Sequence, residues 1–188
     1  SDVCSSDLNT FLRARGLSIG DSFFENDKVD VAKDILREAS GQGQARIVLP
    51  VDLVIVKELR AHSTFKIVKA EQIPEGWSAV DIGPETVELF KKIIGEARMI
   101  LWNGPLGAYE YPPFNKGTEM VARAIAEAGA ESIVGGGDIV AALDQLGLSH
   151  QMTHISTGGG AILEFWEGKE LPGLAAIDES NRTESENR

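Results

Sequence analysis

Three glycine-rich loops contain the residues of this sequence that are best suited to chemistry. They are Asn103-Gly104-Pro105-Leu106-Gly107, Gly135-Gly136-Gly137-Asp138 and Ser156-Thr157-Gly158-Gly159-Gly160, and each follows a short apolar run typical of a strand. Because glycine has no Cβ, a phosphate can approach the backbone closely, and N–H groups at the start of a helix attract an anion. One such loop often only turns the chain. Three of them favour a ligand that contains phosphate.

Two carboxylates stand beside these loops. Asp138 directly follows the triple glycine, at a predicted helix N-terminus. An aspartate there is either an ordinary N-cap or a ligand of Mg²⁺ on a bound nucleotide, and the residues alone favour neither role. Glu110 follows the first loop, where an acidic side chain can accept hydrogen bonds from ribose hydroxyls, although a solvated surface glutamate is the commoner case.

Composition and missing motifs exclude several function classes. Neither a G-x-x-x-x-G-K-[ST] loop nor a G-x-G-x-x-G turn is present, which argues against P-loop enzymes and Rossmann dehydrogenases. A net charge of -11 argues against a nucleic-acid partner. No apolar run approaches the ~18 residues of a membrane helix, and the single cysteine, Cys4, fits no zinc-site spacing. We therefore expect a cytoplasmic protein without a membrane partner.

Helical periods alternate with short apolar runs along the chain, and these elements must position the loops. The order predicts an α/β fold of three layers, with a mostly parallel sheet and helices on both faces. Ligands of such sheets bind where the strands end, which is where the three loops lie. Strands are predicted at 46–50, 53–56, 65–68, 98–102, 131–134 and 152–155. Helices are predicted after Asp27 as N-cap, from Pro84, at 116–128, at 139–146 and after Gly160.

The motifs resemble those of the phosphoglycerate kinase family, a family of two-lobed glycolytic kinases. The resemblance is to its C-terminal, Rossmann-like nucleotide-binding lobe. It divides the chain into a tail outside the family pattern at 1–8, a partial lobe at 9–177 and a disordered polar tail at 178–188. The motifs that carry it, in family order, are Val48–Asp52, Asp81–Thr86, Trp102–Gly107, Gly135–Asp138, His154–Ala161 and Leu163–Gly173.

The resemblance implies a reaction and a role for each site residue. The reaction is Mg²⁺-dependent phosphoryl transfer between 1,3-bisphosphoglycerate with ADP and 3-phosphoglycerate with ATP. The implied nucleotide-binding residues are Val80 beside the adenine, Glu110 on the ribose, and Asn103, Gly104, Pro105 and Gly107 along the nucleotide. The implied phosphate-binding residues are Gly135, Gly136, Gly137, Asp138 and Ile139, with Asp138 as the metal ligand. The implied catalytic residues are Gly158, Gly159 and Gly160, whose N–H groups face the transferred phosphoryl group.

The sequence also departs from the family pattern. Ile139 stands where the family usually has Ser or Thr, so only its backbone N–H is expected to contact phosphate. The N-terminal lobe, which holds 3-phosphoglycerate, and the first strands of the C-terminal lobe have no counterpart in these residues. We therefore expect no kinase activity from this chain alone. The resemblance implies a monomer for full-length relatives. A nucleotide- or phosphate-binding module without catalysis is the alternative, and a truncated product without a stable fold is a third possibility.

Overall fold

The computed structural model describes residues 6–41, 45–156 and 168–169. Within these ranges, no helix is both long and apolar enough to cross a membrane. The helices are α1 (Ser6–Ala14), α2 (Val29–Glu38), α3 (Pro84–Gly95), α4 (Lys116–Glu127) and α5 (Gly137–Leu146), with 3₁₀ turns at Asn26–Lys28 and Ser149–Gln151. The strands are β1 (Asp52–Val56), β2 (Phe65–Lys69), β3 (Ser78–Ile82), β4 (Met99–Asn103), β5 (Glu131–Gly135) and β6 (His154–Ser156).

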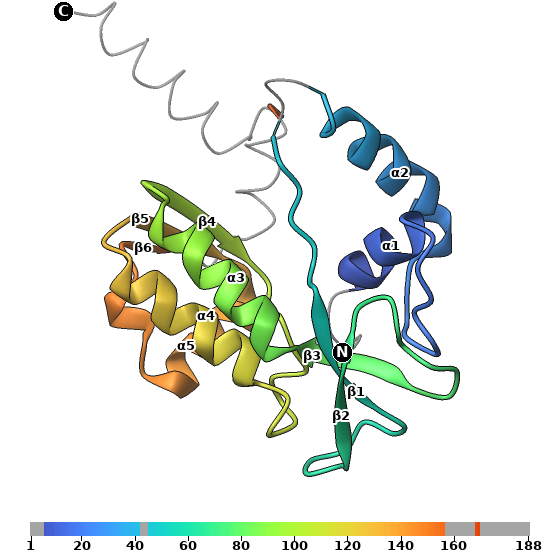
Figure 1. The fold of residues 1–188 in the computed structure, drawn as a ribbon. Helices are drawn as coiled ribbons and strands as arrows, with labels where there is room; N and C mark the ends of the chain where they lie inside the picture. Colours follow the sequence, from blue (N-terminus) through green and yellow to red (C-terminus); the bar gives the residue numbers. More distant parts are fainter. Residues whose placement is uncertain (1–5, 42–44, 157–167, 170–188) are drawn as a thin grey trace, which may run out of the picture.

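The described strands form two sheets of three strands each. One is parallel, with the order β4-β5-β6, and α3, α4 and α5 lie over it (Figure 1). The other is antiparallel, with the order β2-β1-β3, and was not predicted. The α/β class and the parallel sheet behind its helices are confirmed.

The main hydrophobic core fills the space between the parallel sheet and its helices and continues to α1 and β1, since Leu12 and Leu53 belong to the same buried cluster. Trp102 and Val134 face the same side because their strands pair in register at these positions. They belong to one buried cluster with Ile125 of α4 and Ile139 and Leu143 of α5, and none of the five is more than 7% exposed. This packing fixes the N-terminus of α5 beside the end of β5.

Two predictions in the N-terminal third need correction. Asp27 lies in the 3₁₀ turn, and the N-cap of α2 is Lys28 instead. The predicted strand at 46–50 is wrong, since these residues carry no strand assignment. The segment runs extended past the end of α2 (Figure 1). A strand forms only through hydrogen bonds to a neighbour, and no described strand pairs with this segment.

The ends of the chain bear on the predicted domain division. Helix α1 begins at Ser6, and Leu8 packs against the main core, so an ordered element starts inside the segment predicted as a tail. The tail at 178–188 and the helix predicted after Gly160 lie outside the described residues. The division itself stays a prediction.

Candidate functional site

The carboxyl ends of β4, β5 and β6 meet at one edge of the parallel sheet. Asn103 at the end of β4 is paired with Gly135 of β5, and Gly135 is paired with Ser156 of β6. All three predicted loops therefore begin at neighbouring positions. Gly158, Gly159 and Gly160 themselves lie outside the described residues, so the structure places only the start of the third loop.

Helix α5 begins at this edge with an uncapped first turn. Gly136 has φ 115° and ψ 134°, a conformation that residues with a Cβ rarely adopt. Val140 donates its N–H to the Gly136 carbonyl at 3.1 Å, so the N–H groups before it have no acceptor within the helix. Gly137 and Asp138 are exposed, whereas the Ile139 side chain is fully buried. Asp138 follows the N-cap by two positions, and no side chain in the part of the chain that the structure describes caps the helix.

The two predicted carboxylates act on one tyrosine. Burial raises the pKa of Tyr109, and the negative charges of Glu110 and Asp138 raise it further. Glu110 is exposed, like Asp138. Glu110, predicted to bind ribose, and Asp138, predicted to bind the metal, therefore come from different loops, but both lie near enough to Tyr109 to raise its pKa.

Backbone hydrogen bonds hold the loop after β4 in place. The N–H groups of Leu106 and Gly107 donate to the buried hydroxyl of Thr118 on α4, at 3.0 and 3.4 Å. Gly104 has φ 80°. A Cβ on Gly107 would lie 2.3 Å from the Phe114 carbonyl oxygen, so no larger residue fits there without movement. Pro105, between these glycines, is half-buried.

Val80 differs from its predicted place beside an adenine. Its side chain is fully buried in a small cluster with Val56, Ala108 and Phe114. Its carbonyl accepts the Ala108 N–H at 2.8 Å. The structure therefore gives Val80 no surface for a base to contact, and Val80 supports the loop that carries Glu110.

Asp52 is a buried carboxylate that the sequence analysis did not single out. It lies on β1 and accepts the N–H groups of Glu85 (3.0 Å) and Thr86 (2.7 Å) in the first turn of α3, and the Thr86 hydroxyl at 2.6 Å. A Cβ on Gly83 would lie 2.3 Å from Asp52 Oδ2. The carboxylate thus caps α3 from a strand rather than from the helix's own N-cap position.

Asp81 has the same role at α4. Oδ1 accepts the Ile82 N–H and Oδ2 accepts the Gly117 N–H, both at 2.8 Å. Burial raises the pKa of Asp81 to about 7, although the two N–H donors oppose that shift. The one signal in the sequence is an aspartate inside an apolar run just before Gly83-Pro84.

The chemistry of the donor set is compatible with Mg²⁺. Among the described residues, no group of three or more His, Cys, Asp or Glu side chains comes together as a metal cage. Mg²⁺ on a nucleotide needs no such cage, because one or two carboxylates and the phosphate oxygens suffice. Asp138, an exposed carboxylate beside N–H groups that can face phosphate, fits such a site.

Similar proteins have one description in common. Relatives described as phosphoglycerate kinase include one from Rubrobacter xylanophilus, 52% identical over 170 residues, which are 90% of this chain and 42% of the relative. Another, from Chloroflexus aggregans, is 49% identical over 175 residues, which are 92% of this chain and 44% of the relative. The chain thus spans less than half the length of these relatives.

Solved structures and the family profile agree with these relatives. The phosphoglycerate kinase structure from Coxiella burnetii superposes with a TM-score of 0.87 at 40% identity, over 92% of this chain and 44% of that one. The structure from Pyrococcus horikoshii gives 0.76 at 32% identity, over 93% and 44%. The profile described as Phosphoglycerate kinase matches residues 7–169. On this match, which covers most of its length, the chain belongs to the phosphoglycerate kinase family.

Proposed function

We propose that this chain is the nucleotide-binding part of a cytoplasmic, glycolytic phosphoglycerate kinase. The enzyme would transfer a phosphoryl group between 1,3-bisphosphoglycerate with ADP and 3-phosphoglycerate with ATP, with Mg²⁺. The observation that carries the proposal is the shared edge where β4, β5 and β6 end beside the uncapped first turn of α5. The family match over residues 7–169 supports it.

The loop after β4 would hold the nucleoside. In this proposal the nucleotide lies along Asn103, Gly104, Pro105 and Gly107, and Glu110 accepts hydrogen bonds from the ribose hydroxyls. The hydrogen bonds from this loop to Thr118 and the bond between Ala108 and Val80 fix the backbone in advance. A preformed loop loses little conformational freedom on binding, which favours affinity.

The first turn of α5 would hold the phosphates. Its free N–H groups, from Gly137 to Ile139, and the positive end of the helix dipole attract an anion even in a chain with a net charge of -11. Gly135 and Gly136 allow close approach, and Asp138 would bind Mg²⁺. When bound, Mg²⁺ neutralises charge on the phosphate oxygens. Catalysis then rests on positioning and on N–H donors, with Gly158, Gly159 and Gly160 proposed to face the transferred group.

The substrate that carries the carboxyl group would bind through parts of the enzyme that correspond to none of these residues. Because the chain spans only 42–44% of the relatives cited, nucleotide binding without catalysis is the second candidate function. A binding measurement tests what the two candidates share. Neither candidate requires turnover by this chain alone, so they are separated by whether the same gene encodes, in frame, the parts of a phosphoglycerate kinase that hold the other substrate.

The test is a calorimetric titration of the chain with MgADP. We expect binding that Asp138→Ala weakens at least tenfold and that Asp30→Ala leaves unchanged. Asp30 is the matched control, an exposed aspartate in the first turn of α2. A repeat with ADP and a chelator should weaken wild-type binding but leave Asp138→Ala almost unaffected. Equal affinities of wild type and Asp138→Ala would contradict the proposed metal ligand.

A further inference from the structure

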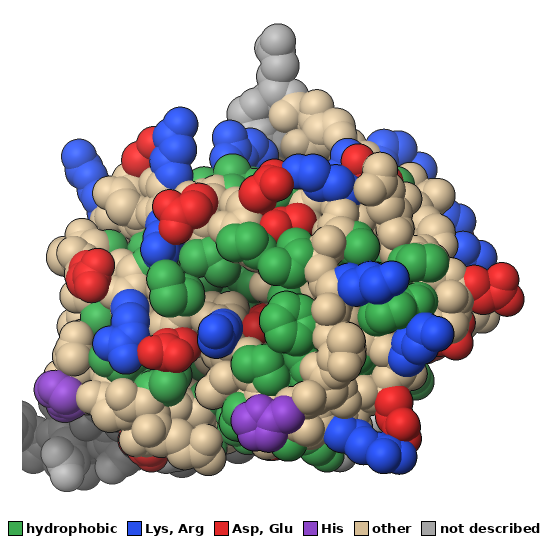
Figure 2. All heavy atoms as spheres, turned by 60° about the horizontal axis from the view of Figure 1, so that its bottom comes forward, with side chains coloured by type: hydrophobic (Ala, Val, Ile, Leu, Met, Phe, Trp, Pro, Cys, Tyr) green, Lys and Arg blue, Asp and Glu red, His purple; other side chains and the backbone are tan. Residues whose placement is uncertain are grey.

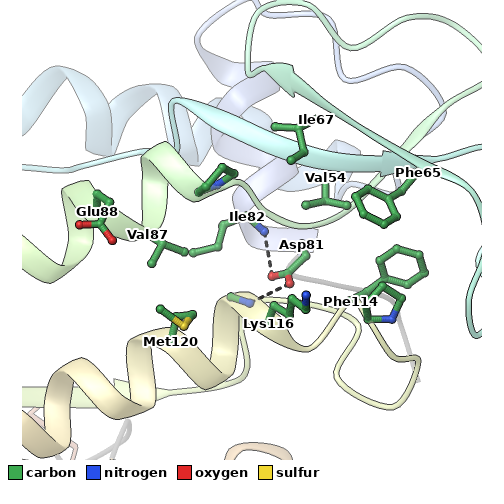
Figure 3. A pocket seen from close by; sticks show the side chains of 13 residues that line it. Val54, Phe65, Ile67, Asp81, Ile82, Val87, Glu88, Phe114, Lys116 and Met120 are labelled. Atoms are coloured by element: carbon green, nitrogen blue, oxygen red, sulfur yellow. Dashed lines mark hydrogen bonds between the residues drawn. The ribbon is translucent and has the colours of Figure 1, made fainter.

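A second cavity lies away from the nucleotide edge. It has a volume of about 370 Å³, within the range of small-molecule sites, and opens between the antiparallel sheet and the first turns of α3 and α4 (Figure 3). Val54, Phe65 and Ile67 line it from the sheet, and Val87 and Met120 from the helices. None of the residues proposed above to bind the nucleotide lines it. We call it the Asp81 cavity, because Asp81 lies between these two walls (Figure 3).

The walls suit an apolar, preferably aromatic body. Phe65 and Phe114 meet edge to face, with ring centroids 6.0 Å apart and an interplanar angle of 89°. Phe65, Ile67 and Met120 are 44%, 51% and 37% exposed, which is unusual for large apolar side chains beside one opening. Figure 2 shows this face as a hollow surrounded by hydrophobic side chains, with an acidic one visible deep inside.

Among the described residues, no cation lies within ion-pair distance of the charge at the bottom of the cavity. Asp81 is 2% exposed and forms none of the ion pairs found among the described residues. Its two hydrogen bonds come from neutral backbone N–H groups. The other charged residues in the lining are Glu88 and Lys116, so acidic groups outnumber basic ones. A buried carboxylate without a cation is costly, and burial accordingly raises the pKa of Asp81 to about 7.

We propose that the Asp81 cavity binds a small organic cation, with its ammonium group directed at Asp81 and its apolar body against Phe65, Phe114 and Ile67. We expect a cation rather than a neutral ligand, because a neutral molecule of the same shape supplies no positive charge to balance the carboxylate. Phe65 and Phe114 favour a ligand with an aromatic ring, which can pack against them. The ligand's ammonium group gains cation–π attraction where it lies over the face of a phenylalanine ring.

The site has a structural link to the proposed nucleotide loop. Asp81 Oδ2 holds the Gly117 N–H at the start of α4, and Asp81 Oδ1 lies 2.4 Å from where a Cβ of Gly107 would stand. A ligand that pairs with Asp81 therefore contacts the same carboxylate against which Gly107 of this loop packs. The binding proposal itself does not depend on nucleotide binding.

The test uses benzylammonium as the probe and benzyl alcohol as its neutral counterpart, titrated into the full chain by calorimetry at pH 8. We expect benzylammonium to bind about tenfold tighter, the scale of one charge-assisted hydrogen bond. Ile67→Ala should weaken benzylammonium at least threefold. The matched control Ile35→Ala, an exposed isoleucine on α2 outside the cavity, should change nothing.

A pH series adds a readout specific to Asp81. An alkylammonium stays charged between pH 6 and 8, whereas Asp81 loses its proton across this range, so affinity for benzylammonium should rise with pH and that for benzyl alcohol should not. Asp81→Asn should abolish both the preference and the slope. The proposal would be overturned if the two probes bound equally, if neither bound, or if Ile67→Ala and Ile35→Ala lost the same affinity. If Asp81→Asn does not fold, the comparison of Ile67→Ala with Ile35→Ala tests the site.

Discussion

Asp52 and Asp81 cap helices to which they do not belong. Each lies on a strand of the antiparallel sheet and accepts N–H groups from the first turn of a helix that covers the parallel sheet. Because these helices have no side-chain cap of their own, the two carboxylates satisfy donors that would otherwise be left without partners. At the scale of single residues, they join the two halves of the described fold.

Removing the Asp52 carboxylate tests its capping role. Asp52→Ala leaves the Glu85 and Thr86 N–H groups without an acceptor, so we expect the free energy of unfolding to fall by about 1–3 kcal/mol. Denaturant unfolding measures this. Glu85→Ala is the control, because it removes only an exposed ion pair with Lys69 and should have almost no effect. Equal losses in the two variants would contradict the role of Asp52.

The pKa of Asp81 predicts a pH dependence of stability. In the unfolded chain the group titrates near its ordinary value of 3.8, and in the folded chain at about 7. Between these values the folded state binds the extra proton. This group's contribution to the free energy of unfolding is therefore greatest at low pH, and falls as pH rises, by up to about 1.4 kcal/mol per unit.

Denaturant unfolding of wild type and Asp81→Asn at several pH values checks this sign. The difference between their unfolding free energies should change between pH 4 and 7 and level off above. Asp138→Asn, an exposed carboxylate changed in the same way, should follow wild type. If wild type and Asp81→Asn had parallel pH profiles, the raised pKa would be wrong.

At the scale of elements, the turn from β5 into α5 depends on two glycines with different roles. Gly136 needs its positive φ, so Gly136→Ala should cost about 1–3 kcal/mol of unfolding free energy. Gly137 starts the helix, and among the described residues no atom outside its own neighbours and helix backbone lies within 4 Å of the point where its Cβ would stand. Gly137→Ala should therefore leave stability equal or slightly higher. Denaturant unfolding compares the two. Similar losses would show that the backbone conformation of Gly136 is not what limits this turn.

The sequence predicted those elements whose signal is local. The apolar periods of α3, α4 and α5 and the runs of β4 and β5 were enough, because strand and helix alternate there without interruption. The meeting of Asn103, Gly135 and Ser156 was predictable too, since carboxyl ends of parallel strands share an edge. These elements carry most of the candidate site.

The sequence did not predict features that depend on contacts between residues far apart along the chain. Strand β3 was missed because Ser78 and Asp81 break its apolar run. One of the two N–H groups that satisfy the buried Asp81 carboxylate comes from Gly117, 36 residues away. The segment 46–50 looks like a strand but has no described partner. The burial of Val80 depends on Ala108 and Phe114, which no local pattern reveals.

At the scale of the whole molecule, the activity we expect depends on how much of its relatives the chain spans. The chain covers 42–44% of the relatives cited. We expect no turnover with 3-phosphoglycerate and MgATP, because loss of a positioned acceptor removes up to ~7–11 kcal/mol of barrier reduction. A coupled assay for ADP release measures this, with a full-length relative as positive control. Turnover that is lost in Asp138→Ala would contradict the expectation and place both substrates on this chain.

The capped and uncapped helix starts should also differ in how fast their amides exchange with deuterium. First-turn amides usually exchange quickly, but those of Thr86 and Gly117 are bonded to buried carboxylates and should exchange as slowly as core amides. The first-turn amides of α5 have no such acceptor among the described residues and should exchange within the dead time of the experiment. The starts of α3 and α4 thus serve as internal references for the start of α5. If exchange becomes slower at the first-turn amides of α5 alone, an anion is bound there.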